Sequence, residues 1–95
     1  METSSRLREL LELEIYPHVY THKFIGQNTE AFLSALAELE AAFPKARRVL
    51  QRESGTGSGG GRYLALTYEL HAESVEEILA LIEATGALVD LKLIL

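Results

Sequence analysis

Cysteine and tryptophan are absent from the 95-residue chain, which also has only two prolines and one methionine. Without cysteine the chain can form no disulfide bond, and thiolate catalysis and cysteine-based zinc sites are excluded. No apolar run approaches the ~18 residues that a membrane span needs, and no basic-then-apolar signal peptide opens the sequence. We therefore expect a cytoplasmic protein with no membrane partner.

What is present is the composition of one small globular domain. Hydrophobic residues make up 47% of the chain and charged residues 24%, values typical of a folded rather than a disordered protein. Fourteen acidic residues against nine basic ones give a formal net charge of -5. A typical domain of about 150 residues leaves no room for a second domain here.

Three leucines at helical spacing mark the first segment: Leu7, Leu10 and Leu11. They predict a short helix over residues 5–13 with Ser5 as its N-cap. A helix this short is stable only when it docks on another element. We therefore divide the chain into an amphipathic N-terminal arm, residues 1–14, and a domain over residues 15–95.

Four segments have the composition or the alternation of strands: residues 15–25, 46–54, 62–72 and 87–95. Pro17 cannot donate to a neighbouring strand, so regular pairing in the first begins after it, and Gly26 ends that strand. The third strand buries alternate residues: Leu64, Leu66, Tyr68 and Leu70. In the last strand one apolar row is predicted, with Asp90 and Lys92 facing away from it: Val89, Leu91, Leu93 and Leu95.

An amphipathic helix follows the first strand. It begins at an N-cap at Asn28 or Thr29, runs to about Phe43 and stops at Pro44. Its apolar face repeats with helical spacing: Phe32, Leu36, Leu39 and Phe43.

A second helix follows the third strand. Ser74 and Glu77 predict a capping box at its start, and Gly86 suits a left-handed residue at its end. The predicted buried residues are Val75, Ile78, Leu79 and Ile82.

The order of elements after the arm is strand-helix-strand-strand-helix-strand. Right-handed crossovers and one hairpin then give a four-stranded antiparallel sheet of order 4-1-3-2, with both helices on one face. This is the ferredoxin-like α+β sandwich.

Several short segments, in this order, carry a family resemblance: the leucine arm, Tyr16-Pro17, residues 23–27, Gly61 with the Tyr63 strand, residues 74–82 and the end of the chain. Over roughly Leu7 to Leu95 they resemble the YbeD-like family of small bacterial proteins of unknown function. The resemblance implies a fold similar to ACT regulatory domains. The family usually has a compact Ser-Ser-Lys-Gly hairpin at this point. In this chain no lysine precedes Gly61, and Arg62 is the basic residue that could replace it.

The glycine-rich segment, residues 55–61, contains a GxGxxG pattern. A dinucleotide site needs those glycines between a strand and a helix, whereas here they join two strands. The segment therefore predicts a mobile hairpin, with no bound cofactor.

The three histidines do not predict a metal site. His18 and His22 are four residues apart on a strand, about 13 Å, which is too far to share one ion. Even positions of the first strand face the helices if Tyr20 and Phe24 set the register, and His71 then lies on the other face. The odd positions of the same strand are aliphatic (Ile15, Val19 and Ile25) and could face the helices instead. The sequence therefore leaves open whether His22 is buried.

An enzyme is not expected. Acylphosphatase-like catalysis on this fold needs an arginine in the first strand-helix loop, and residues 25–28 contain none. No nucleophile is tied to an oriented base elsewhere in the sequence.

Five of the nine basic residues lie close together, with only Glu53 opposing them: Lys45, Arg47, Arg48, Arg52 and Arg62. This segment could hold nucleic acid, phosphate or an acidic protein, or it could protect an edge strand from association. Two features argue against RNA binding. The net charge is -5, and Tyr63 is the one aromatic residue expected on the uncovered face of the third strand.

The remaining candidate site is the sheet face that the helices leave uncovered. Lys23, Tyr63 and Lys92 are predicted there, with Lys23 and Tyr63 as neighbours and Arg62 close by, in position to bind a small anion or a partner's carboxylate. Apolar residues expected on this face, among them Val19 and Ile94, and two free edges favour a homodimer. The sequence thus predicts a small non-catalytic regulatory or interaction module for an unknown protein or small anionic ligand. The alternative is a nucleic-acid-binding module that uses the basic edge at residues 45–62.

Overall fold

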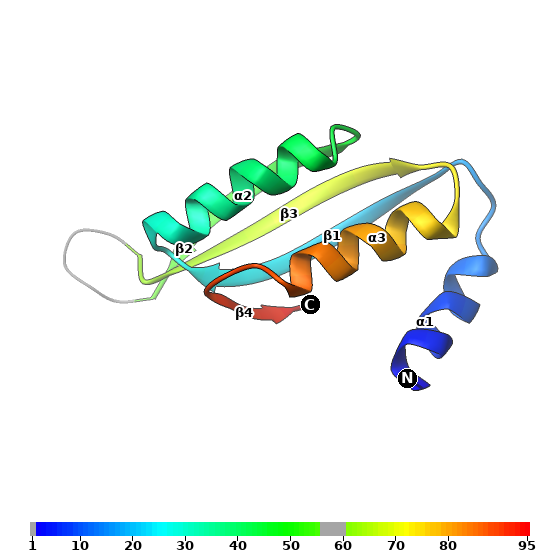
Figure 1. The fold of residues 1–95 in the computed structure, drawn as a ribbon, viewed down its shortest axis with the longest axis horizontal. Helices are drawn as coiled ribbons and strands as arrows, with labels where there is room; N and C mark the ends of the chain where they lie inside the picture. Colours follow the sequence, from blue (N-terminus) through cyan, green and yellow to red (C-terminus); the bar gives the residue numbers. More distant parts are fainter. Residues whose placement is uncertain (1, 56–60) are drawn as a thin grey trace.

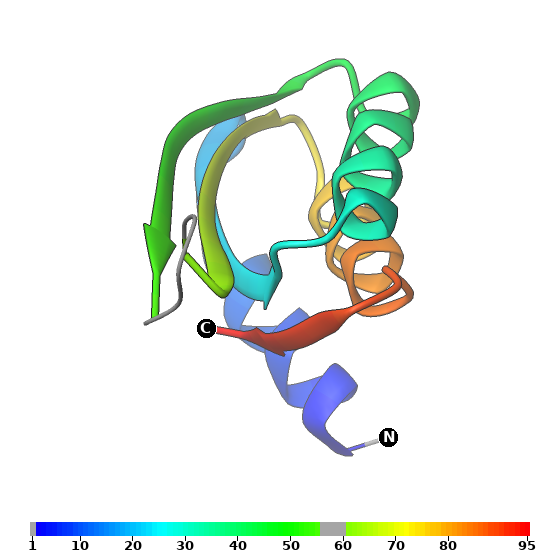
Figure 2. The same cartoon turned by 90° about the vertical axis from the view of Figure 1, so that its left-hand side faces the viewer.

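An antiparallel sheet of four strands forms one layer of the molecule, and two helices cover one of its faces (Figures 1 and 2). The computed structural model describes residues 2–55 and 61–95. The elements are α1 (Glu2–Glu12), β1 (His18–Gln27), α2 (Glu30–Ala42), β2 (Ala46–Ser54), β3 (Tyr63–Ala72), α3 (Val75–Gly86) and β4 (Leu91–Ile94). The sheet order is β2-β3-β1-β4, which is the predicted order counted from the opposite edge. The sequence predicts mobility for residues 55–61, and residues 56–60 of this hairpin lie outside the described residues.

The even-numbered residues of β1 face the helices, as Tyr20 and Phe24 predicted. Phe24 is fully buried, and the alternate residues Val19, Thr21 and Lys23 lie on the other side of the sheet. The prediction that Gly26 ends this strand is wrong, because Gly26 lies inside β1 and is itself buried.

The last strand is shorter than predicted and its alternation is broken. The pairing of β1 with β4 shifts register between Ile25 and Gly26. Leu93 consequently pairs with Ile25 on the uncovered side, whereas Ile94 pairs with Phe24 on the helix side, the reverse of the prediction. The predicted apolar row does not form, since a bulge puts consecutive residues out of phase.

Both ends of α3 differ from the prediction. The Ser74 side chain makes no capping bond, and Glu77 instead accepts hydrogen bonds from the Glu73 backbone N–H (3.1 Å) and from Lys45 Nζ (2.9 Å). Gly86 is the last helical residue and has no left-handed backbone; Asp90 has one, with φ 64°. The buried residues are Val75, Ile78, Leu81 and Thr85, while Leu79 and Ile82 are only partly buried.

The core lies between the sheet and the helices α2 and α3, and the arm packs at its edge. Leu11 of α1 is 7% exposed, and its carbonyl accepts a hydrogen bond from the Tyr16 hydroxyl (2.9 Å). Arg8 reaches Glu76 of α3 at 3.3 Å. The helix begins three residues before Ser5, so Ser5 is not its N-cap. No helix in residues 2–55 and 61–95 is long and apolar enough to cross a membrane.

Candidate functional site

The sheet face opposite the helices, here called the open face, is not covered by any helix in the described part of the chain (Figure 2). The strand register assigns its residues, because directly paired residues point to the same side of a sheet. They are Val19, Thr21, Lys23, Ile25 and Gln27 of β1, Arg47, Leu50, Arg52 and Ser54 of β2, Tyr63, Ala65, Thr67, Glu69 and His71 of β3, and Lys92 and Leu93 of β4.

The open face is positively charged in a chain whose net charge is -5. Glu69 is its one carboxylate among the residues named above. Its cations are Lys23, Arg47, Arg52 and Lys92. Among the described residues, none of these four forms an ion pair. The charges of Lys23, Arg47 and Arg52 are therefore available to a ligand, while Lys92 lies over the Tyr63 ring.

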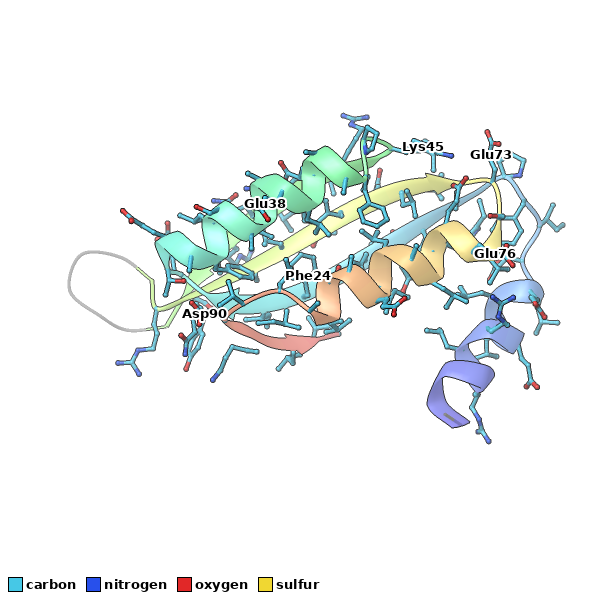
Figure 3. All side chains as sticks on the ribbon, in the orientation of Figure 1. Phe24, Glu38, Lys45, Glu73, Glu76 and Asp90 are labelled. Atoms are coloured by element: carbon cyan, nitrogen blue, oxygen red, sulfur yellow. The ribbon has the colours of Figure 1, made fainter. Side chains whose placement is uncertain are left out.

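The opposite layer carries the opposite charge. Helices α2 and α3 contain six glutamates and no lysine or arginine: Glu30, Glu38, Glu40, Glu76, Glu77 and Glu83. Figure 3 shows Glu38 on α2 and Glu76 on α3, both on the helical layer. Glu40, Glu76 and Glu77 are paired with Arg48, Arg8 and Lys45. The charges without an ion pair among the described residues are thus segregated, with cations on the open face and Glu30, Glu38 and Glu83 on the helical layer.

The predicted site residues share the open face but do not form one cluster. Lys92 Nζ lies 5.9 Å from the centroid of the Tyr63 ring, so these two are neighbours. Tyr63 pairs with Gln27, whereas Lys23 pairs with Thr67. Four residues along a strand span about 13 Å, and the prediction that Lys23 and Tyr63 are neighbours is therefore wrong.

Arg62 lies beside this corner of the sheet. It is exposed and directly precedes β3, and its carbonyl accepts a hydrogen bond from the Asn28 backbone N–H (2.9 Å). Its guanidinium forms no ion pair with another described residue.

The basic segment between residues 45 and 62 is divided between the two sides of the sheet. Lys45 pairs with Glu77 at 2.9 Å, and Arg48 pairs with Glu40 at 2.6 Å, so both are neutralised by the helical layer. A register shift between Arg48 and Leu50 puts Arg47, Leu50 and Arg52 on the open face. Arg47 and Arg52 are therefore site residues that strand alternation alone could not separate from Arg48.

A hydrogen-bonded cluster fastens β2 to α2. The Tyr68 hydroxyl donates to Glu40 Oε2 (2.5 Å), and Arg48 Nε donates to the same oxygen (2.8 Å). Burial opposes ionisation of Glu40, but the hydrogen bonds from Tyr68 and Arg48 outweigh it and lower the pKa of this carboxyl group. Burial, together with the bond to Glu40, raises the pKa of Tyr68. The cluster is structural, because its hydrogen bonds join side chains of β2, β3 and α2 to one another.

Exposed apolar side chains share the open face with the cations. Leu50 is 56% exposed, Val19 46% and Leu93 45%. Large exposed apolar side chains gathered on one face mark interaction surfaces more often than isolated ones do.

Among the histidines, His22 alone is fully enclosed, with 1% of its surface exposed. Its Nε2 lies 3.0 Å from Thr85 Oγ1, and that hydroxyl donates its single hydrogen to the Leu81 carbonyl (2.8 Å). Nε2 must therefore carry the proton and donate to Thr85. The other ring nitrogen, Nδ1, has no hydrogen-bond partner among the described residues. Burial lowers the pKa of His22 from 6.5 to about 4.

This arrangement predicts a loss of stability in acid. Between pH 6.5 and about 4 the unfolded chain binds a proton at His22 while the folded protein does not, so stability falls as the pH is lowered through this window. The loss reaches about 3 kcal/mol at pH 4 and is absent above pH 6.5. Urea unfolding of the wild type and of His22→Phe, across this window, should show a steeper pH dependence in the wild type.

The variant His71→Gln serves as the control, because His71 is exposed on the open face. Its pH profile should match that of the wild type. Equal slopes for the wild type and His22→Phe between pH 4 and 6.5 would show that His22 is not the group responsible.

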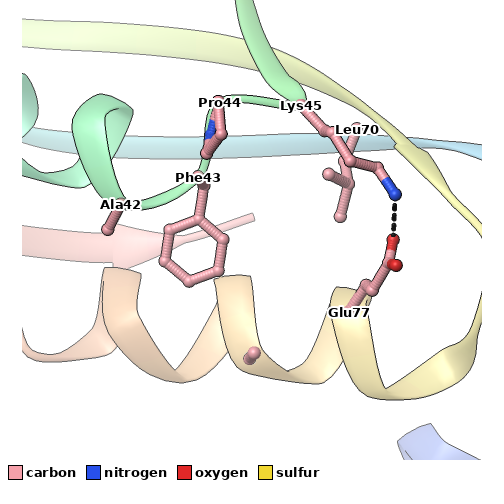
Figure 4. A pocket seen from close by; sticks show the side chains of 7 residues that line it. Ala42, Phe43, Pro44, Lys45, Leu70 and Glu77 are labelled. Carbon is pink, nitrogen blue, oxygen red and sulfur yellow. Dashed lines mark hydrogen bonds and ion pairs between the residues drawn. The ribbon is translucent and has the colours of Figure 1, made fainter.

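Among the described residues, no pair of catalytic groups faces either hollow of the helical layer. A cleft of about 260 Å³ beside the end of α2 is lined mainly by apolar residues such as Phe43 and Leu70 (Figure 4). Its two charged residues, Lys45 and Glu77, neutralise one another. A shallower hollow of about 380 Å³ between α2 and α3 contains one titratable residue, Glu38. Nor do residues 2–55 and 61–95 include a group of three or more histidines and carboxylates that could hold a metal ion.

These features define a small α+β protein with a three-helix, four-stranded open-sheet structure and one uncovered cationic face. The model of a family described as "Protein of unknown function (DUF493)" matches residues 12–95, and the chain belongs to this family. The same family includes YbeD. No curated protein and no solved structure matches the chain.

Proposed function

We propose that this protein is a small non-catalytic interaction module that binds an anionic partner on its open face. The observation that carries the proposal is the set of four cations without ion pairs, among the described residues, on a face that no described helix covers. Placing like charges on one surface costs free energy unless a partner offsets it. The clefts of the helical layer offer no comparable set of groups.

The fold supports a regulatory role. The strand order and the two helices on one face agree with a ferredoxin-like arrangement, and we infer the ACT-like and YbeD-like relationship from the residues that carry the resemblance. Fold alone does not define a function; the open face gives this proposal its site.

A homodimer, if it forms, should use the sheet edges. Two open faces brought together would oppose Lys23, Arg47 and Arg52 of each copy, with Glu69 alone to offset them. Like charges in contact across an interface cost several kcal/mol. Pairing along an edge strand avoids that repulsion.

A nucleic-acid-binding module is the second candidate. The observation that favours it is the same set of unpaired cations, two of which, Arg47 and Arg52, come from the basic segment. Phosphate contacts from lysine and arginine would give salt-dependent binding without sequence preference. This candidate differs from the first in the partner and not in the face used.

The proposal is tested by removing two open-face charges. The double substitution Lys23→Gln and Arg52→Gln should change the free energy of unfolding by less than about 0.5 kcal/mol for each site, since both side chains lie on the uncovered side of the sheet. The tagged wild type and variant are used to capture partners from nuclease-treated lysate of the source organism. At least one protein should be enriched by the wild type and lost with the variant. Each lost charged contact should weaken the free energy of binding by about 1–3 kcal/mol.

The control removes the same number of charges elsewhere. The substitutions Arg6→Gln and Lys45→Gln lie off the open face, and they should retain the captured protein. Identical capture by all three proteins, or no capture by the wild type, would contradict the proposal. Capture that occurs from untreated lysate and is absent from nuclease-treated lysate would instead favour the nucleic-acid module.

A further inference from the structure

We infer that the occupant of the open face is a segment of another protein that alternates carboxylates with aliphatic side chains. This inference rests on the proposed function, because it specifies the partner of the same face. Three observations carry it: the spread of the cations, the apolar residues between them, and the state of Tyr63.

The cations are too widely spread to serve one small anion. Arg47 and Arg52 are five residues apart on β2, and Lys23 lies two strands away on β1. Strands are spaced about 4.8 Å apart and rise about 3.3 Å per residue, so these side chains start roughly 10–15 Å from one another. A ligand that engages them together must be extended and carry several negative charges.

Apolar residues occupy the positions between these cations. Leu50 lies between Arg47 and Arg52 on β2. It pairs with Thr67 of β3, which in turn pairs with Lys23 of β1. The next row across the sheet places Ala65 and Ile25 between Arg52 and Leu93. A phosphate backbone has no groups that match Leu50 and Leu93, whereas an acidic amphipathic peptide has both kinds of side chain.

Two aromatic rings lie on the open face, Tyr63 and His71, and they are eight residues apart on β3. Lys92 Nζ lies 5.9 Å from the Tyr63 ring centroid, in the position where a nucleobase would stack. Binding to single-stranded nucleic acid gains much of its affinity from such stacking. The open face therefore has no two neighbouring free rings on which successive RNA bases could stack, and it keeps cations that carboxylates need.

An unbiased selection of peptide ligands tests the inference. A library of random peptides of about twelve residues, long enough to cross the sheet, is displayed and selected on the wild type in about 0.15 M salt. We expect the selected peptides to be enriched in Asp and Glu together with Leu, Ile or Val. The dissociation constant of the best peptide should rise roughly tenfold or more with Lys23→Gln/Arg52→Gln, and several-fold with Leu50→Ser. It should change less than about twofold with the control Arg6→Gln/Lys45→Gln.

The outcomes separate this inference from the proposed function. Selected peptides that lack carboxylates, or the absence of any selected peptide, would overturn the acidic partner. So would tighter binding of a mixed-sequence single-stranded RNA. In those cases lysate capture that depends on Lys23 and Arg52 can still support the proposed function. Acidic peptides that bind the wild type and the open-face variant equally would overturn both, because the open face would not be the site.

Discussion

Replacing Gly26 with alanine is expected to lower the free energy of unfolding by about 3 kcal/mol. A Cβ atom at this position would lie closer than 3.0 Å to three carbon atoms of the Phe32 ring. Phe32 is fully buried on α2 within the core and contacts Phe24, so moving its ring disturbs core packing. Urea denaturation at constant m-value measures the change.

Gly86→Ala is the matched control for this prediction. A Cβ atom there meets nothing within 4 Å, and the residue is the last of α3 with a backbone that alanine adopts freely. The substitution should stabilise the protein by about 0.5–1 kcal/mol, since alanine loses less backbone entropy on folding. A Gly26→Ala protein as stable as the wild type would mean that Phe32 does not pack against β1.

Replacing Leu66 with alanine is expected to cost about 2–5 kcal/mol. Leu66 is 1% exposed on the helix side of β3, and the cavity left by a truncated side chain cannot be filled by solvent. The same substitution at Leu50, 56% exposed on the open face, should cost less than about 0.5 kcal/mol. Thermal or urea unfolding compares the two directly.

The leucine pair also separates stability from binding. Leu50→Ala should weaken binding of an acidic, aliphatic peptide while leaving the protein folded. At moderate temperature Leu66→Ala should weaken binding only in proportion to the unfolded fraction. Equal stability losses at the two positions would mean that the assignment of the two faces is wrong.

Elements defined by local signals are predictable from the sequence. Ala46–Ser54 forms β2 as predicted, and the Thr29 hydroxyl accepts the capping hydrogen bond from the Phe32 N–H at the start of α2. The alternation of Leu64, Leu66 and Tyr68 locates the buried face of β3. In each case the residues that set the structure lie within a few positions of one another.

Features that depend on contacts between distant segments are not predictable in this way. The register shifts in the pairing of β2 with β3 and of β1 with β4 change which residues share a face, and no local pattern marks them. Strand alternation therefore cannot single out Arg47 and Arg52 as open-face residues. A local pattern likewise interprets Gly26 as the end of a strand, whereas the need for glycine comes from the Phe32 ring on the following helix.

The segregation of charge between the two layers gives the molecule a permanent electric dipole across the sheet. Packed layers lie about 10 Å apart, and at physiological salt the Debye length is about 8 Å. A ligand approaching the open face therefore senses its cations more strongly than the glutamates behind them. A molecule with a net charge of -5 can in this way rotate its positive side toward an anionic partner before contact, and its association rate should fall steeply as salt is added.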